Sequence, residues 1–180
     1  MRIRLADDKL LTDSIVDGEG LRSVLWTQGC SHNCKGCHNP STHAFDKGVL
    51  VDVLEVKKLI KDLTLQDGIT LSGGDPFFQP EACLEIAKFA KEEGLNVWAY
   101  TGFLFEDLIN NKKARNLLNY IDVLVDGPFV LENRTLSLKF RGSSNQRIIN
   151  VPRSLKQGRV SVIKKYDKIS TRKVPKKLYI

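Results

Sequence analysis

Apolar residues gather in four short segments of the chain that are rich in β-branched and aromatic side chains. These segments cover residues 21–28, 68–71, 95–100 and 121–125. Runs of this length and composition are typical of β-strands. The pattern therefore predicts four strands.

Two stretches between these segments have the periodicity of helices. In residues 53–63, the apolar residues that fall near one helical face are Val53, Val56, Leu59, Ile60 and Leu63. Residues 80–92 begin with Pro at a first-turn position and are followed by Gly94. Strands that alternate with helices predict an α/β fold with a parallel sheet, either doubly wound or curved into a partial barrel.

A Gly-containing loop follows each predicted strand. The loops contain residues 27–30, 72–75, 100–102 and 126–128. In parallel α/β folds, ligands bind at the carboxyl ends of the strands. We therefore expect the four loops to converge on one site.

Length and composition match those of an ordinary globular domain. The chain has 180 residues, of which 42% are hydrophobic and 27% charged, and this length suits a single core. It contains no apolar run of about 18 residues that could span a membrane. Residues 1–11 lack the long apolar stretch of a secretory signal. We expect a cytoplasmic protein without a membrane partner.

The net charge of +7 is unevenly distributed. Residues 151–180 contain ten Lys or Arg and a single acid, whereas residues 1–150 have a slight excess of acids. We therefore expect a domain at residues 1–150 and a basic C-terminal extension at residues 151–180. A loosely packed extension that docks on an acidic partner, or keeps the protein soluble, is favoured over a contact with nucleic acid.

Three of the four cysteines, Cys30, Cys34 and Cys37, lie within eight positions. Without an export signal, such a group favours metal binding over disulfides. Soft thiolates suit both iron–sulfur clusters and zinc. Three cysteines that hold a four-iron cluster leave one iron open to a bound molecule, and the spacing favours this catalytic arrangement. Zinc remains the alternative, with a fourth ligand from His32, His38 or His43.

The fourth cysteine and two aromatic residues are expected to pack in the core. Cys83 lies in the predicted helix at residues 80–92, among apolar neighbours, and is expected in the core. Trp98 and Tyr100 alternate with smaller residues as strand residues do, so core packing is favoured over base stacking.

The spacing C-x3-C-x2-C resembles the signature of radical S-adenosylmethionine enzymes. The resemblance implies a 4Fe-4S cluster held by Cys30, Cys34 and Cys37, whose open iron binds the amino and carboxylate groups of S-adenosylmethionine. Members of the family usually carry an aromatic residue before the third cysteine, where this chain has Gly36. The resemblance thus implies that Gly36, Cys37 and His38 contact the cofactor through backbone or imidazole.

A second segment, Ser72-Gly73-Gly74-Asp75-Pro76, resembles the Gly-Gly-Glu loop of the same family, with Asp in place of Glu. Glycines let the backbone approach a ligand closely, and an acid can face an ammonium group. The resemblance therefore implies that Gly73, Gly74 and Asp75 bind the cofactor, with Asp75 toward the methionyl amine. Thr101, at the end of the next strand, is a further candidate contact.

Other motifs narrow the resemblance to activases that install a glycyl radical in a partner enzyme. Residues 16–22 (VDGEGLR) and 37–40 (CHNP) are similar to segments of such activases. Residues 122–129 (DVLVDGPF) and 141–147 (RGSSNQR) resemble the closing motifs of the activating proteins of anaerobic ribonucleoside-triphosphate reductase. The resemblance extends from about residue 10 to about residue 150.

This resemblance implies a fold, an activity and partners. The fold would be a partial (β/α) barrel of parallel strands, open on one side. The activity would be generation of a 5′-deoxyadenosyl radical that takes hydrogen from a glycine of the reductase large subunit. A reducing donor, such as flavodoxin or a thioredoxin-like system, would supply the electron.

Three alternatives remain open at the level of sequence. The chain could activate another glycyl-radical enzyme, or could act on a small molecule as a deazapurine synthase does, which Glu19 keeps possible. A zinc-stabilised module that binds nucleic acid through the basic extension is the third. Outside the resemblance, Asp17, Glu19 and Arg22 could form only a surface turn with a salt bridge.

Overall fold

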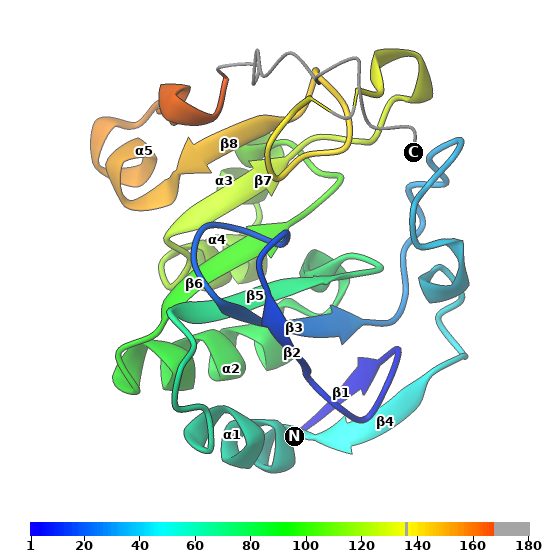
Figure 1. Ribbon diagram of the computed structural model, residues 1–180, viewed down its shortest axis with the longest axis vertical. Helices are drawn as coiled ribbons and strands as arrows, with labels where there is room; N and C mark the ends of the chain where they lie inside the picture. Colours follow the sequence, from blue (N-terminus) through cyan, green and yellow to red (C-terminus); the bar gives the residue numbers. More distant parts are fainter. Residues whose placement is uncertain (136, 168–180) are drawn as a thin grey trace, which may run out of the picture.

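The computed structural model describes residues 1–135 and 137–167 of the chain (Figure 1). Its centre is a row of four parallel strands in chain order: β3 (Arg22–Thr27), β5 (Gly68–Gly73), β6 (Asn96–Tyr100) and β7 (Val123–Asp126). These are the four strands that the apolar segments predict. The α/β class and the parallel pairing are confirmed.

Short antiparallel strands extend this row at both sides. At one side lies β8 (Arg147–Asn150), which pairs with β7. At the other lie β1 (Arg2–Leu5), β2 (Leu11–Ser14) and β4 (Val49–Asp52). Both β1 and β2 pair with β3, and β4 pairs with β1. The apolar pattern does not predict these strands, since each has only four residues, three of them exposed in β2 and two in β4.

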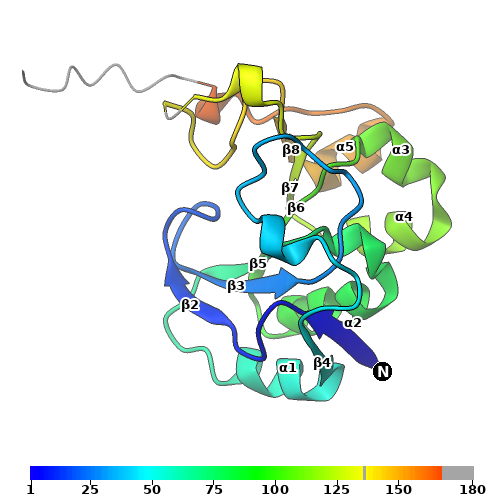
Figure 2. The ribbon, with the colours of Figure 1, turned by 90° about the vertical axis from the view of Figure 1, so that its right-hand side faces the viewer.

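Helices connect the parallel strands: α1 (Val53–Lys61), α2 (Pro80–Glu92), α3 (Phe105–Asn110) and α4 (Lys112–Leu118). A further helix, α5 (Val151–Gln157), follows β8. Single 3₁₀ turns lie at Pro40–Thr42, Pro76–Phe78, Leu131–Asn133 and Lys164–Tyr166. Figure 2 shows α2 and α4 on the side of the sheet opposite β2. Among the described residues, no helix is long and apolar enough to cross a membrane.

The core lies between this helical layer and the sheet. Helix α2 buries Cys83, Ile86, Ala87 and Ala90 against it, each with no exposed surface. The expectation that Cys83 is a core residue is confirmed, and burial raises the pKa of its thiol. Because one helical layer covers one face of the row of strands, the other face and the carboxyl ends are left for loops.

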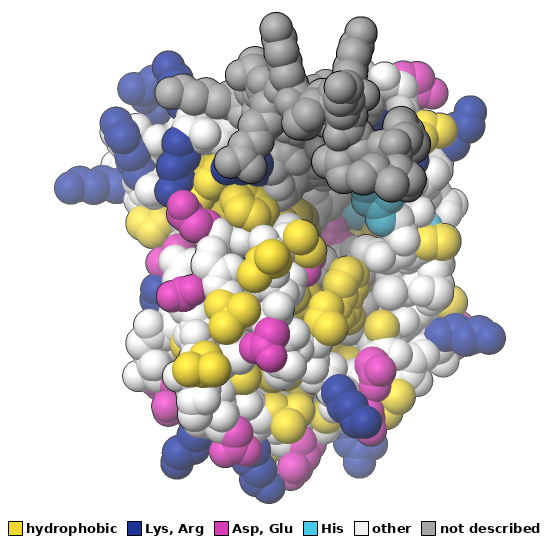
Figure 3. Space-filling view, viewed as in Figure 1, with side chains coloured by type: hydrophobic (Ala, Val, Ile, Leu, Met, Phe, Trp, Pro, Cys, Tyr) yellow, Lys and Arg dark blue, Asp and Glu magenta, His cyan; other side chains and the backbone are white. Residues whose placement is uncertain are grey.

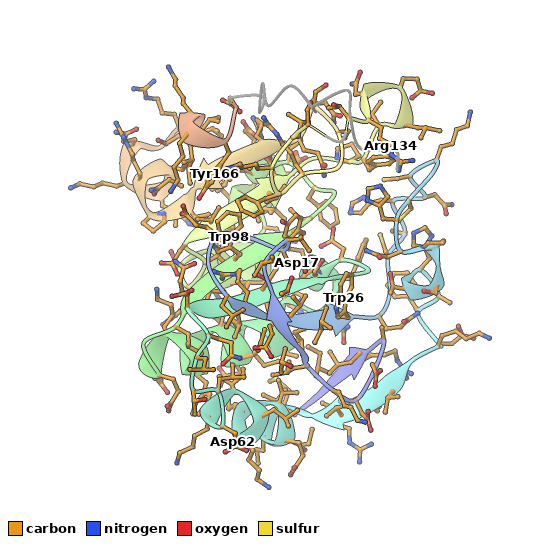
Figure 4. All side chains as sticks on the ribbon, viewed as in Figure 1. Asp17, Trp26, Asp62, Trp98, Arg134 and Tyr166 are labelled. Carbon is orange, nitrogen blue, oxygen red and sulfur yellow. The ribbon has the colours of Figure 1, made fainter. Side chains whose placement is uncertain are left out.

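The first part of the basic extension packs on the sheet. Val151 and Ser154 of α5 are buried, and so is Tyr166. The Tyr166 ring lies 5.9 Å from that of Trp98 and 5.3 Å from that of Phe140, between centroids (Figure 4). Residues 151–167 therefore differ from the loosely packed extension that charge alone predicts, because Val151 and Tyr166 are buried. The remainder lies outside the described residues, and the division at residue 150 stays a prediction.

Candidate cluster and cofactor site

A cavity of about 720 Å³ lies at the carboxyl ends of the parallel strands. Cys30, Cys34 and Cys37 line it, together with residues from the loops that follow β5, β6 and β7. The four Gly-containing loops thus converge as the sequence predicts. Figure 3 shows the face of the molecule that carries β2, where exposed hydrophobic side chains gather. Ile15 and Val16 line the cavity and are each 71% exposed.

The cysteine loop begins where β3 ends. The backbone N–H of Cys30 donates to the carbonyl of His43 at 2.9 Å, and that of Cys37 donates to the carbonyl of Cys34 at 3.1 Å. All three cysteines are free and partly exposed. Burial raises the pKa of the Cys30 thiol to about 11, so this thiol would release a proton when it binds a metal.

The donor set of this loop fits an iron–sulfur cluster. Three thiols on the wall of one cavity can each bind a different iron, as cysteines do in such clusters. Within residues 1–135 and 137–167, no three His, Cys, Asp or Glu side chains are grouped closely enough to hold one metal ion. The fit therefore rests on the chemistry of the thiols and on the cavity that they share.

The Gly73-Gly74 loop lies against the start of the cysteine loop, and both glycines line the cavity. The N–H of Gly74 donates to the carbonyl of Thr27 at 2.8 Å, and the N–H of Asp75 donates to that of Gly29 at 3.1 Å. A Cβ atom at Gly74 would lie 2.5 Å from the carbonyl oxygen of Gly29. Glycine is needed here because the loop packs on backbone as well as facing the cavity.

Asp75 is a buried residue of the loop that follows β5. Its side chain is 1% exposed and is not among those that line the cavity. Its carboxylate accepts hydrogen bonds from the backbone N–H of Phe77, from Gly102 N–H, from the Thr101 hydroxyl and from His32 Nε2. Oδ2 accepts three of these bonds and Oδ1 accepts one, so protein donors bind both oxygens.

Of the two neighbours of Cys37, only His38 lines the cavity. His38 lines the cavity, and its ring lies 5.0 Å from that of Phe129, which also lines it. Gly36 has a φ of +73° and is not among the lining residues. Of the six predicted cofactor residues, the structure thus brings Cys37, His38, Gly73 and Gly74 to the cavity.

Comparison with known proteins agrees with this site. The family described as a 4Fe-4S single cluster domain matches residues 16–149. The activating protein of anaerobic ribonucleoside-triphosphate reductase from Haemophilus influenzae is 40% identical over 142 residues, which are 74% of this chain and 90% of that protein. The chain belongs to this family of activating proteins. The match to the 4Fe-4S single cluster family places a 4Fe-4S domain at residues 16–149.

Other members are similarly close. The activating protein from Vibrio cholerae is 39% identical over 142 residues, covering 74% of this chain and 90% of its own. That of enterobacteria phage T4 is 36% identical over 148 residues, covering 78% and 91%. Among solved structures, QueE from Escherichia coli covers 57% of this chain and 53% of its own, with 14% identity and a TM-score of 0.45, too low for any assignment.

The motifs that resemble the activating proteins form part of the cavity wall. Asp126 lies opposite Arg147 in the pairing of β7 with β8. The Gln146 side chain donates to the carbonyl of Gly127 at 3.0 Å and accepts from the N–H of Gly142 at 2.9 Å. Residues 126–129 and 141–147 are thus joined by hydrogen bonds, which supports a structural role for both segments.

The Arg22 motif is also structural, and the surface-turn alternative is wrong for this residue. Arg22 is 1% exposed. Its guanidinium donates to the Thr70 hydroxyl at 2.7 Å and to the carbonyl of Asn96 at 2.9 Å. Burial lowers the pKa of Arg22 to about 10. The side chain thus connects β3 by hydrogen bonds to β5 and to the start of β6.

Among the other lining residues, Asp17, Tyr100 and Arg141 belong to segments that the sequence singles out, whereas Trp26 was missed (Figure 4 labels Asp17 and Trp26). Burial raises the pKa of the Tyr100 hydroxyl. The period of two along β3 was a usable signal, because it places Trp26 on the face of the strand opposite that of Leu25, which packs in the core.

Proposed function

We propose that this protein uses a 4Fe-4S cluster and S-adenosylmethionine to install a glycyl radical on the large subunit of anaerobic ribonucleoside-triphosphate reductase. The observation that carries the proposal is the cavity that Cys30, Cys34 and Cys37 share with Gly73 and Gly74. The match of this chain covers 90% of the length of two activating proteins, and about 40% of the matched residues are identical.

Cys30, Cys34 and Cys37 would hold three irons and leave the fourth for the cofactor. When bound, the cluster and cofactor supply one electron and the 5′-deoxyadenosyl radical that takes a hydrogen atom from the glycine α-carbon. The backbone of Gly73 and Gly74 would orient the cofactor from the opposite loop.

Around the third cysteine, His38 would lie beside the adenine, held by its contact with Phe129. Gly36 would act through the turn that it forms rather than by direct contact, because it is not among the residues that line the cavity. These residues need only bind, orient and exclude water, since no acid–base step is required of them.

The sheet would function as a partial (β/α) barrel of the radical S-adenosylmethionine type, open on one side. Its parallel strands follow chain order, and helices α2 and α4 lie on the side opposite β2. The open face bears Ile15 and Val16, whose exposure suits a polypeptide substrate. We further propose a cytoplasmic location and a reducing protein, such as flavodoxin or a thioredoxin-like system, as electron donor.

Anaerobic reconstitution with iron and sulfide, followed by dithionite and S-adenosylmethionine, tests the proposal. We expect about four irons per chain and production of 5′-deoxyadenosine. With the reductase added, electron paramagnetic resonance should detect a glycyl doublet. One bound zinc with no iron, or absence of 5′-deoxyadenosine even with the reductase, would refute the assignment. A doublet only with a different glycyl-radical enzyme would identify another partner.

A further inference from the structure

We propose that Asp75 and His32 are positioning residues that hold the cysteine loop in place, and that the Asp75 carboxylate does not bind the cofactor. The inference rests on the proposed function, because it concerns how that site is supported. It departs from the role that the Gly-Gly-Glu resemblance implies for this acid.

The decisive contact joins two loops that are far apart in sequence. His32 lies between Cys30 and Cys34, and its Nε2 lies 2.7 Å from Asp75 Oδ2, as an N–H donor to the carboxylate. The side chain of His32 is 17% exposed and that of Asp75 is 1% exposed. A charge-assisted hydrogen bond in such a sheltered place is stronger than one in water.

Three further donors, from Thr101, Gly102 and Phe77, bind the Asp75 carboxylate. Asp75 Oδ2 also accepts from the Thr101 hydroxyl at 2.8 Å and from the Gly102 N–H at 2.9 Å, both just beyond the end of β6. Asp75 Oδ1 accepts from the Phe77 N–H at 2.9 Å. An ammonium group would have to displace one of three donors to reach Oδ2, and the whole side chain is only 1% exposed.

The imidazole of His32 packs against two aromatic rings. Its ring lies 4.5 Å from that of Phe103, in an edge-to-face arrangement, and 5.5 Å from that of Phe78. A Cβ atom at Gly102 would lie 2.5 Å from His32 Cδ2. The glycine after Thr101 is therefore explained by the histidine ring that packs against it.

These contacts connect the ends of three neighbouring strands. Asp75 follows β5, Thr101 follows β6, and His32 belongs to the loop after β3. The backbone bond from the Asp75 N–H to Gly29 strengthens the same connection. The placement of the thiols relative to Gly73 and Gly74 thus depends on one buried carboxylate, which acts on the cluster through His32.

Two variants test this role. Asp75→Asn keeps the shape of the side chain but presents an N–H₂ group to its donors, and His32→Phe keeps the aromatic packing but loses the hydrogen bond. Asp46→Asn, an exposed acid beyond the cysteine loop, removes the same charge as a control. The measurements are iron per reconstituted chain, the rate of iron loss to a chelator, the spectrum of the reduced cluster and the Kd for S-adenosylmethionine.

We expect both variants to lose iron about 10-fold faster than wild type or more, on the scale by which outer-shell changes weaken metal affinity. The reduced-cluster spectrum should change before any cofactor is added. The double variant should lose iron no faster than the more affected single variant, because both changes break one contact. Asp46→Asn should behave as wild type.

Two results would overturn the inference. One is an Asp75→Asn protein with wild-type iron retention and spectrum but a weakened Kd, as expected of a ligand to the methionyl amine. The other is unchanged iron retention in His32→Phe, which keeps its packing and so tests the role even if Asp75→Asn does not fold. Either result leaves the proposed function standing, whereas wild-type protein that holds no iron refutes that function instead.

Discussion

At the scale of single residues, the buried carboxylate of Asp126 is matched by donors from other parts of the chain. Asp126 has no exposed surface. It accepts from Arg147 Nε at 2.9 Å and from the backbone N–H of Phe105 at 2.8 Å. A buried carboxylate of this kind is tolerated only while its partners remain.

The pair of Asp126 and Arg147 gives a prediction on stability. Arg147→Met should destabilise the metal-free protein by about 3–5 kcal/mol, because it leaves a buried charge without its cation. Urea denaturation followed by circular dichroism measures the change. Arg153→Met, at an exposed position of α5, should stay within about 0.5 kcal/mol of wild type. Equal losses in the two variants would contradict this account.

The cysteines provide a second prediction, with a control inside the chain. Cys34→Ala should remove both cluster assembly and 5′-deoxyadenosine production, because it deletes a thiolate ligand. Cys83→Ala should keep both and cost about 1 kcal/mol in stability, because it leaves a small void in the core. Iron analysis and product assays on both variants decide this. Normal turnover by Cys34→Ala would be incompatible with the proposed site.

At the scale of elements, the 3₁₀ turn Lys164–Tyr166 is attached to a segment about 146 residues away. The Tyr166 hydroxyl donates to Glu19 Oε2 at 2.7 Å, and Lys165 Nζ donates to both carboxylate oxygens. The hydrogen bonds from Lys165 and then Tyr166 lower the pKa of Glu19. The Glu19 and Lys165 side chains are more than half exposed, so these polar contacts contribute little beside ring burial.

Two substitutions at Tyr166 should separate these contributions. Tyr166→Ala should destabilise the protein by about 3–5 kcal/mol, as expected for loss of a buried aromatic ring. Tyr166→Phe keeps the ring beside Trp98 and should cost about 1 kcal/mol or less. Thermal and urea unfolding measure both. A loss in Tyr166→Phe as large as that in Tyr166→Ala would mean that the hydroxyl, rather than the ring, holds the turn.

At the scale of the whole molecule, strand order places the site. Strands β3, β5, β6 and β7 run parallel and in chain order, so the loops that follow them meet at one end. Residues 147–150 form the edge strand β8 and lead directly into α5. The extension is thus continuous with the sheet rather than attached to its surface by a separate linker.

Truncation tests whether residues 1–150 form an independent unit. A chain that ends at residue 150 lacks the buried residues Val151, Ser154 and Tyr166. We expect it to be destabilised by at least about 3 kcal/mol, since each buried apolar side chain contributes roughly 1.5–3 kcal/mol. Differential scanning calorimetry of both chains measures this. An unchanged unfolding temperature would support the two-part division predicted from charge.

Several features could be predicted from the sequence because they depend on local pattern. The parallel strands are buried on both faces and therefore appear as short apolar runs, and α2 has a clear periodicity with Pro80 at its start. Helices α3 and α4 escaped prediction because they have six and seven residues and are separated only by Asn111. Such short elements are stabilised by tertiary packing more than by their own sequence.

The sequence by itself determined the chemistry of the site: three thiols in one loop, a Gly-Gly loop after the next strand, and their meeting at one end of a parallel sheet. Only the tertiary structure decided how Asp75 is surrounded. Three of its four donors come from His32, Thr101 and Gly102, which lie 26 to 43 residues away. No local pattern records how many donors surround a carboxylate, because that number depends on which distant loops fold against it.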